Sequence, residues 1–142
     1  MGEWRETGRG VVLPAHCDHY GHMSARWYIP FFDDAGFHTW TVFGCSYAQM
    51  KENGNETMAA QYIVNYRKEL KAGDLFFIHS AFTRLGNKSC TQTHRMYNAD
   101  TEALCATAQC TEVFSDPTTH KSIVMPAWVR QRLEKVVIHL DD

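Results

Sequence analysis

The strongest constraint on the fold is a succession of strand-length segments between residues 57 and 115. Segments 58–70, 75–84, 89–97 and 102–114 are separated by short stretches that contain Gly, Asn or Asp, residues typical of turns. Connections of hairpin length join antiparallel neighbours. We therefore expect an antiparallel meander in which each of these strands pairs with the next.

A helix rich in aromatic residues is expected before this sheet. An apolar stripe recurs there at helical spacing, and it consists of Tyr28, Phe31, Phe32, Ala35 and Thr39. One face of the last strand carries small or modest side chains (Leu104, Ala106, Ala108, Cys110). Because small side chains let a helix approach closely, we place the helix of residues 25–43 across that face. A short strand over residues 10–14 precedes it, and a helix from Pro126 to Lys135 ends an α+β fold.

Length and charge limit the function classes. A chain of 142 residues with 44% hydrophobic residues is expected to form one domain over residues 1–142. The net charge of −2 argues against a nucleic-acid binder. No apolar run reaches the roughly 20 residues of a membrane helix, and the polar N-terminus does not resemble a signal peptide. We therefore expect a cytoplasmic protein, and five cysteines without paired spacing fit reduced thiols.

The densest polar cluster is the segment from His16 to His22, and three interpretations of it compete. His16, Cys17, His19 and His22 are metal-ligand types, although their spacing matches no closed zinc motif. The segment also fits a solvated turn whose side chains bond the backbone. In the third interpretation, Asp18 acts on a carbonyl while the unpaired N–H groups of the following helix stabilise the oxyanion.

Other catalytic arrangements are weaker. The chain contains no GxSxG elbow, no GxGxxG and no Walker-type loop. Cys17 lies beside two histidines, but a buried thiol is the better interpretation. The carboxylate arrangement needs no serine, metal or cofactor.

The order of several motifs resembles that of the hotdog-fold acyl-CoA thioesterases of the 4-hydroxybenzoyl-CoA thioesterase type. The carrying residues are Pro14 to Met23, the aromatic helix, and the segments Asn65–Arg67, Ala72–Asp74, Leu85–Ser89, Asn98–Thr101, Lys121–Ser122 and Met125–Pro126. The resemblance covers residues 9–132. It implies a long central helix wrapped by an antiparallel sheet, and it implies homodimers or homotetramers.

The resemblance also assigns roles to residues. It implies that Asp18 is the nucleophile or general base, that the backbone amide of Ala25 polarises the thioester carbonyl, and that His22 completes the catalytic group. Tyr28 is expected near the acyl group. Thr57, Met58 and Gln61 of a neighbouring subunit are expected to complete the pocket, and Lys88, with Arg84 nearby, is expected to meet the CoA phosphates. No cofactor is implied.

The expected activity is hydrolysis of an acyl-CoA to a carboxylic acid and CoA. Met23, Ser24 and Ala25 depart from the Asn-Asn that often follows Gly-His in the family. An aromatic cage for a cationic acyl group is a further hypothesis. The alternatives are a non-catalytic hotdog module that binds acyl-CoA and a metal-dependent hydrolase that uses the histidines.

Overall fold

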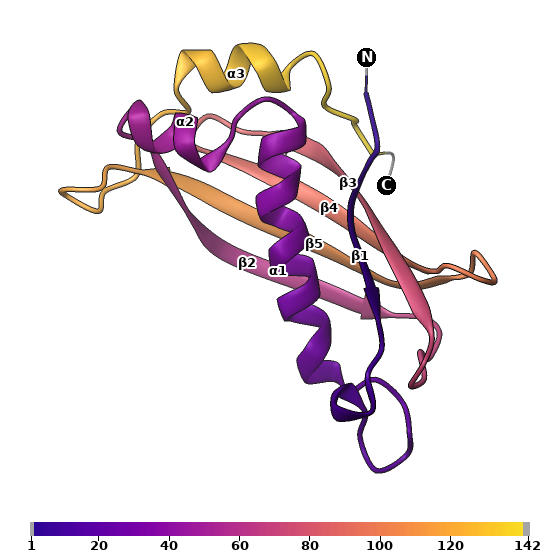
Figure 1. Ribbon diagram of the computed structural model, residues 1–142. Coiled ribbons are helices and arrows are strands. Elements are labelled where there is room, and N and C mark those ends of the chain that lie inside the picture. Colours follow the sequence, from indigo (N-terminus) through magenta and orange to yellow (C-terminus); the bar gives the residue numbers. More distant parts are fainter. Residues whose placement is uncertain (1, 141–142) are drawn as a thin grey trace.

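A long helix lies across one face of an antiparallel sheet in the computed structural model, which describes residues 2–140 (Figure 1). The strands are β1 (Arg5–Val11), β2 (Glu56–Tyr66), β3 (Leu75–Leu85), β4 (Ser89–Asn98) and β5 (Leu104–Ser115). The helices are α1 (Ala25–Val42), α2 (Tyr47–Glu52) and α3 (Ala127–Leu133), and a 3₁₀ turn spans Pro14–His16. The expected α+β class with its central helix is confirmed.

The sheet order corrects one expectation. Its order is β1-β3-β4-β5-β2, so β3, β4 and β5 form the expected meander, whereas β2 pairs with β5 and not with β3. The reason lies in residues 67–74. They leave the sheet before the expected strand end at residue 70 and carry Leu70 into the core, where its carbonyl accepts a 2.7 Å hydrogen bond from the N–H of Met23.

Two further elements differ from expectation. Strand β1 begins earlier than residue 10, because Arg5 to Val11 pair with β3 although their sequence lacks an apolar pattern. The helix α2 was not expected. It begins with a capping box in which the Ser46 hydroxyl accepts from the N–H of Gln49 and the Gln49 side chain accepts from the N–H of Ser46.

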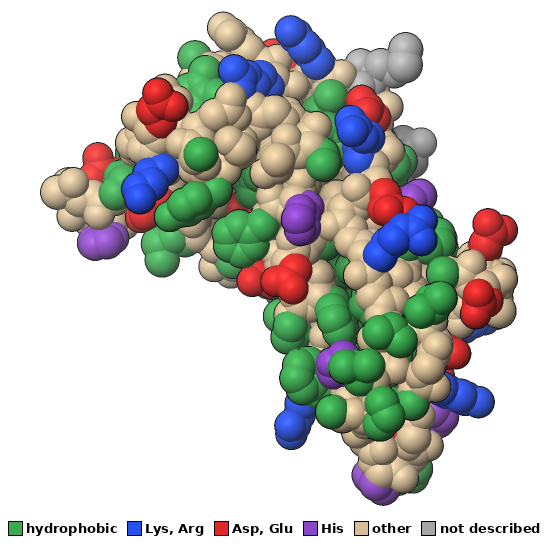
Figure 2. Space-filling view, in the orientation of Figure 1, with side chains coloured by type: hydrophobic (Ala, Val, Ile, Leu, Met, Phe, Trp, Pro, Cys, Tyr) green, Lys and Arg blue, Asp and Glu red, His purple; other side chains and the backbone are tan. Residues whose placement is uncertain are grey.

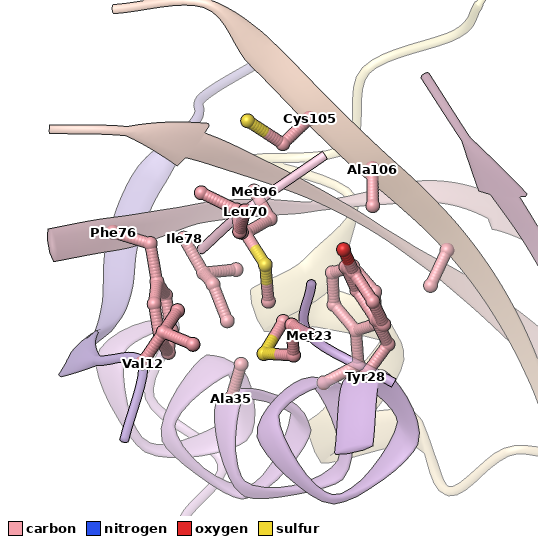
Figure 3. Close-up of a cluster of buried hydrophobic side chains, with 12 residues drawn as sticks. Val12, Met23, Tyr28, Ala35, Leu70, Phe76, Ile78, Met96, Cys105 and Ala106 are labelled. Atoms are coloured by element: carbon pink, nitrogen blue, oxygen red, sulfur yellow. The ribbon is translucent and has the colours of Figure 1, made fainter. Parts of the chain in front are cut away.

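Helix α1 packs on the inner sheet face through the expected aromatic stripe. Tyr28, Phe32 and Ala35 are buried with Ala106 and Ala108 of β5. The small side chains of β5 therefore do face the helix, as expected, although the backbone of α1 approaches β1 and β3 more closely. Figure 3 shows Tyr28 and Ala35 pointing from the helix into this cluster.

A second cluster fills the other end of the helix. Trp40 of α1 and Phe43, the residue directly after the helix, pack edge-to-face on Phe82 of β3, with ring centroids 4.8 and 5.7 Å away. Val129 and Leu133 of α3 close this cluster. The two clusters bury opposite ends of α1. Among residues 2–140, no helix is both long and apolar enough to cross a membrane.

Candidate active site

The site begins with the turn that holds Asp18. One carboxylate oxygen, Oδ1, accepts hydrogen bonds from the N–H of Tyr20 (2.9 Å) and the N–H of His22 (3.4 Å). The backbone closes the same turn, because the N–H of Asp18 donates to the carbonyl of His22. Gly21 sits in the left-handed region with φ +83°, which glycine adopts without steric cost. The carboxylate is exposed, and none of the described residues donates to Oδ2.

His22 points away from this carboxylate. Its Nε2 lies 3.1 Å from Oε2 of Glu69, in the segment between β2 and β3. Its backbone also forms an isolated bridge with Lys71. His22 therefore ties the turn to the 67–74 connection.

The start of α1 supplies unpaired backbone donors. Ser24 occupies the N-cap position but makes no side-chain bond to the first turn. Its hydroxyl therefore does not cap the helix as its residue type predicted. Among the described residues, none accepts a hydrogen bond from the N–H of Ala25. A helix N-terminus with free N–H groups favours negative charge, so an oxyanion placed there would be stabilised.

An open pocket of about 430 Å³ brings four of the expected residues together. Asp18, His22, Ala25 and Tyr28 all line it, and Tyr66 of β2 forms the opposite wall. Tyr28 is nearly buried, its ring meets that of Tyr66 edge-to-face at 5.0 Å, and burial raises its pKa to about 12. The tyrosine is therefore a neutral hydrogen-bond donor near neutral pH.

A second cavity, of about 330 Å³, lies between α1 and the beginning of β2. Thr57 is the one residue of the expected substrate-binding set that lines it. Met58 and Gln61 lie on exposed positions of β2 and line neither pocket. The two pockets lie on one flank of the helix, because Ala25 and Gly36 are about three turns apart at 3.6 residues per turn. Their separation along the axis is roughly 16 Å at about 1.5 Å per residue.

The floor of this second cavity is polar, and the sequence reasoning missed it. The carboxylate of Glu112 accepts hydrogen bonds from Nε1 of Trp40 (3.2 Å), Nε2 of Gln92 (3.1 Å) and Oγ1 of Thr57. Burial raises the pKa of Glu112 above its ordinary value. His94 also lines the cavity, and burial lowers its pKa to about 4. The available signal was that Gln92 and His94 share one face of β4 with the apolar Cys90 and Met96.

Arg84 and Lys88 lie far from Asp18 in the same chain. They flank the β3–β4 hairpin, at the opposite end of β3 from residue 75, and a strand of this length spans roughly 33 Å at about 3.3 Å per residue. The Arg84 side chain donates to Oγ1 of Thr91 (3.0 Å) and to Oγ of Ser89 (2.8 Å). Within one chain, these cations therefore lie at the other end of β3 from the 67–74 connection that contacts the Asp18 turn.

The side chains of the histidine-rich segment diverge. The His16 ring packs on Trp27 with centroids 4.7 Å apart, and the His19 ring packs on Tyr20. Cys17 directs its thiol to the carbonyl of Leu13 at 3.7 Å. In residues 2–140, no three His, Cys, Asp or Glu side chains converge as metal ligands would.

The surface around the site is apolar in part. Figure 2 views the face on which α1 and β1 lie, and hydrophobic side chains gather over it. Val11, Ile29 and Phe37 of these two elements are among the exposed apolar residues. Large exposed apolar areas often mark binding or association surfaces.

Comparison with known proteins agrees with the fold. Residues 12–133 match the family described as the thioesterase-like superfamily. No curated protein matches the chain in sequence.

Solved structures are similar over most of the chain. YbaW, a probable thioesterase from Escherichia coli, has 24% identity and a TM-score of 0.80, with 94% of this chain and 99% of that chain covered. A DHNA-CoA thioesterase from Staphylococcus aureus has 18% identity and a TM-score of 0.81, with 93% and 89% covered. A second Staphylococcus aureus protein, SAV2348, was solved in complex with CoA and has 17% identity and a TM-score of 0.83, with 97% and 89% covered. This likeness confirms the hotdog fold.

Proposed function

The chain belongs to the thioesterase-like superfamily, which it matches over residues 12–133, and from this membership we propose that it is a single-domain hotdog enzyme that hydrolyses an acyl-CoA thioester. The products are a carboxylic acid and free CoA. The observation that carries the proposal is the shared pocket of Asp18 and Ala25. A carboxylate with an oxygen free of protein donors faces the same open space as a free helix N-terminus.

The reaction follows from these two groups. The thioester carbonyl oxygen lies against the N–H of Ala25, which stabilises the negative charge that develops on it. Asp18 then acts in one of two ways. As a nucleophile, it forms a mixed anhydride and expels the CoA thiolate, and water hydrolyses the anhydride. As a general base, it takes a proton from the water that attacks the carbonyl directly.

CoA is the proposed carrier of the acyl group because of the relatives. One similar protein was solved in complex with CoA, and another is a DHNA-CoA thioesterase. A CoA ester places several phosphate charges outside the acyl pocket. Arg84 and Lys88 are exposed cations that suit those phosphates, provided that a second copy brings them near Asp18.

A second copy would also join the two cavities. Strand β2 is an edge of the sheet, and an edge strand presents unpaired backbone groups to another strand. If two copies pair their β2 strands antiparallel about Gln61, the middle of Glu56–Tyr66, then Tyr66 of one copy lies opposite Glu56 of the other. Tyr66 lines the Asp18 pocket and Glu56 lines the second cavity. The reacting carboxylate of one copy then faces the second cavity of the other copy, which we take as the site of the acyl group and call the acyl cavity. Thr57, Met58 and Gln61 lie at the junction.

The test compares Asp18→Asn with wild type by thiol release from acyl-CoA esters with short, long, aromatic and cationic acyl groups. Asparagine can accept the same turn hydrogen bonds through Oδ1 but is neither nucleophile nor base. We expect kcat to fall by at least about 10²-fold. The matched control is Asp34→Asn, which removes an exposed helix carboxylate outside both pockets.

The two outcomes separate an enzyme from a binding module. Loss of turnover in Asp18→Asn with an unchanged melting temperature supports the thioesterase. If wild type binds CoA esters tightly but hydrolyses none of them, the non-catalytic hotdog module replaces it. If chelation of metals abolishes turnover, the metal-dependent hydrolase gains support instead.

A further inference from the structure

Two buried polar atoms without partners lie beside the cavity between α1 and β2, one on His94, which lines the cavity, and one on Gln92, which does not. These are Oε1 of Gln92 and Nε2 of His94, and neither has a hydrogen bond within residues 2–140. Both side chains belong to fully buried residues of β4. A buried polar atom left unpaired costs about 1–3 kcal/mol. Such atoms beside a cavity are explained if a bound molecule supplies the missing hydrogen bonds through the open space at Gly36.

Both atoms lie next to Gly36 of α1, which has no side chain. A Cβ added to Gly36 would lie 3.6 Å from Oε1 of Gln92 and 4.0 Å from Nε2 of His94. Gly36 and His94 both line the cavity, together with Glu112. The absence of a side chain at Gly36 therefore keeps open the space into which the two atoms point.

The surrounding hydrogen bonds indicate that Nε2 of His94 is an acceptor. Nδ1 of His94 lies 2.5 Å from Oγ of Ser80, which lies 2.7 Å from Oγ1 of Thr7, and Thr7 reaches the carbonyl of Ile78. Every proton finds an acceptor when Nδ1–H donates to Ser80, Ser80 to Thr7, and Thr7 to Ile78. The proton of the neutral ring then sits on Nδ1, and Nε2 offers a lone pair.

The charge of the lining points the same way. The carboxylic acids that line the cavity are Asp33, Glu56 and Glu112, and no lysine or arginine of residues 2–140 lines it. Glu112 is already bonded by Trp40, Thr57 and Gln92. The floor thus presents acceptors and negative charge, so a ligand group there must donate hydrogen bonds and must not be an anion.

The aromatic lining and the volume of the cavity determine which kind of ligand body fits it. Phe37, Trp40, Tyr47 and Tyr62 line the cavity with aromatic rings. Its volume of about 330 Å³ exceeds the roughly 150 Å³ of an engineered cavity that binds benzene. A ring or short chain with a polar substituent therefore fits between the aromatic walls and the polar floor.

We propose that this cavity selects acyl groups whose far end carries a hydrogen-bond donor, and that Gln92, His94 and Glu112 recognise that end. The inference rests on the proposed thioesterase function, because it takes the cavity as the acyl site. A hydroxyl group and an ammonium group share the required chemistry. A carboxylate at the same place is repelled by Glu112, whose carboxylate already takes the donors of Trp40, Thr57 and Gln92, so dicarboxylic acyl groups are rejected.

The first test uses phenylacetyl-CoA esters that differ only at the para position: hydrogen, hydroxyl, aminomethyl and carboxylate. We expect kcat/KM for the hydroxyl or the aminomethyl ester to exceed that for the unsubstituted ester by at least about tenfold, which corresponds to about 1.4 kcal/mol. The carboxylate ester is expected to be the poorest. The two donor esters distinguish a hydroxyl from an ammonium ligand. Equal values for the unsubstituted and both donor esters would overturn the proposal.

Binding separates this proposal from the proposed function. The same four acyl groups are presented as thioether analogues of the CoA esters, which cannot be hydrolysed, and their Kd values are measured by calorimetry. If no ester is hydrolysed but the donor-tipped analogues bind more tightly, the thioesterase fails and the cavity assignment stands. If esters are hydrolysed without preference and the analogues bind equally, the cavity assignment fails and the thioesterase stands.

Two substitutions test whether the side chains of Gln92 and Glu112 cause the preference for donor-tipped acyl groups. Gln92→Met keeps the side-chain length but removes the acceptor, so the ratio of hydroxyl to unsubstituted kcat/KM is expected to fall about tenfold. Glu112→Gln keeps an acceptor but removes the charge, so the aminomethyl ester is expected to lose more than the hydroxyl ester. Gln109→Met, at an exposed position of β5 outside both pockets, is the matched control. Ratios that stay at the wild-type value in a folded Gln92→Met protein would contradict the assignment, and if that variant does not fold, the wild-type panel decides.

Discussion

A Cβ atom added to Gly36 would lie 4.0 Å from Nε2 of His94. A glycine in the middle of a helix costs about 1 kcal/mol relative to alanine. In α1 it lies at a buried position that faces unpartnered polar atoms. Glycine at this position thus leaves space beside the acyl cavity but lowers the stability of helix α1. Functional sites often carry such a stability cost.

Gly36→Ala is expected to stabilise the protein and to impair the cavity. The added methyl would make ordinary van der Waals contacts, 3.6 Å or more from its neighbours, so the helix propensity raises the free energy of unfolding by about 0.5–1 kcal/mol. The same methyl narrows the floor, so kcat/KM for donor-tipped esters should fall more than for the unsubstituted ester. Urea unfolding and the para-substituted panel measure the two effects. A variant as selective as wild type would show that the floor does not contact the acyl group.

His94 should make stability depend on pH. Burial lowers its pKa to about 4 from the ordinary 6.5, so below pH 6.5 the unfolded chain takes up a proton that the folded chain does not. Stability is complete above pH 6.5 and is lost as the pH falls towards 4, by about 3 kcal/mol in total. His94→Gln removes this loss. Urea unfolding at pH 7 and pH 4.5 compares the two proteins.

The raised pKa of Glu112 acts in the opposite direction. The Glu112 carboxyl takes up its proton at a higher pH in the folded chain than in the unfolded chain. Its contribution to the free energy of unfolding therefore grows as the pH falls through the raised pKa. Both proteins contain Glu112, so the difference between wild type and His94→Gln isolates the histidine. An equal loss of stability in both would mean that His94 is not buried as a neutral ring.

Sequence alone was enough to predict features that are local in the chain. The strands β3, β4 and β5 follow from alternation and turn residues within each hairpin. Asp18 could be named as a candidate because the turn, the glycine and the helix start lie within eight residues of it. The register of β2 was missed because its partner, β5, is some 50 residues away and residues 67–74 gave no signal of leaving the sheet.

The polar floor was beyond prediction for the same reason. Trp40, Thr57, Gln92 and Glu112 come from α1, β2, β4 and β5. Each taken alone looks like an ordinary helix or strand residue. Only the packing of the helix on the sheet reveals that the three donors share one carboxylate.

Gly21→Ala should loosen the turn that holds Asp18. At φ +83° an alanine is strained by roughly 1–2 kcal/mol, while the space around the position is open, with no atom within 4 Å of an added Cβ. The strain is therefore the whole effect, and we expect lower kcat with a melting temperature that falls by a few degrees. Gly21→Asn, which tolerates this conformation better, is the matched control. Equal losses in both variants would indicate that something other than backbone conformation matters there.

Gln61→Glu should weaken self-association if β2 strands pair about this residue. Two copies related by a two-fold axis there bring the two new carboxylates together, and like charges opposite one another cost up to about 1 kcal/mol, or about a fivefold rise in the dimer Kd. Sedimentation velocity over a dilution series measures that Kd, and added salt should reduce the difference. Gln109→Glu makes the same change at an exposed position of the neighbouring strand β5, and it controls for net charge.

If turnover per chain also falls on dilution, and falls earlier in Gln61→Glu than in Gln109→Glu, the acyl site needs both copies. Identical assembly of the two variants would place the interface elsewhere and leave the Asp18 pocket and the acyl cavity to be joined within one chain.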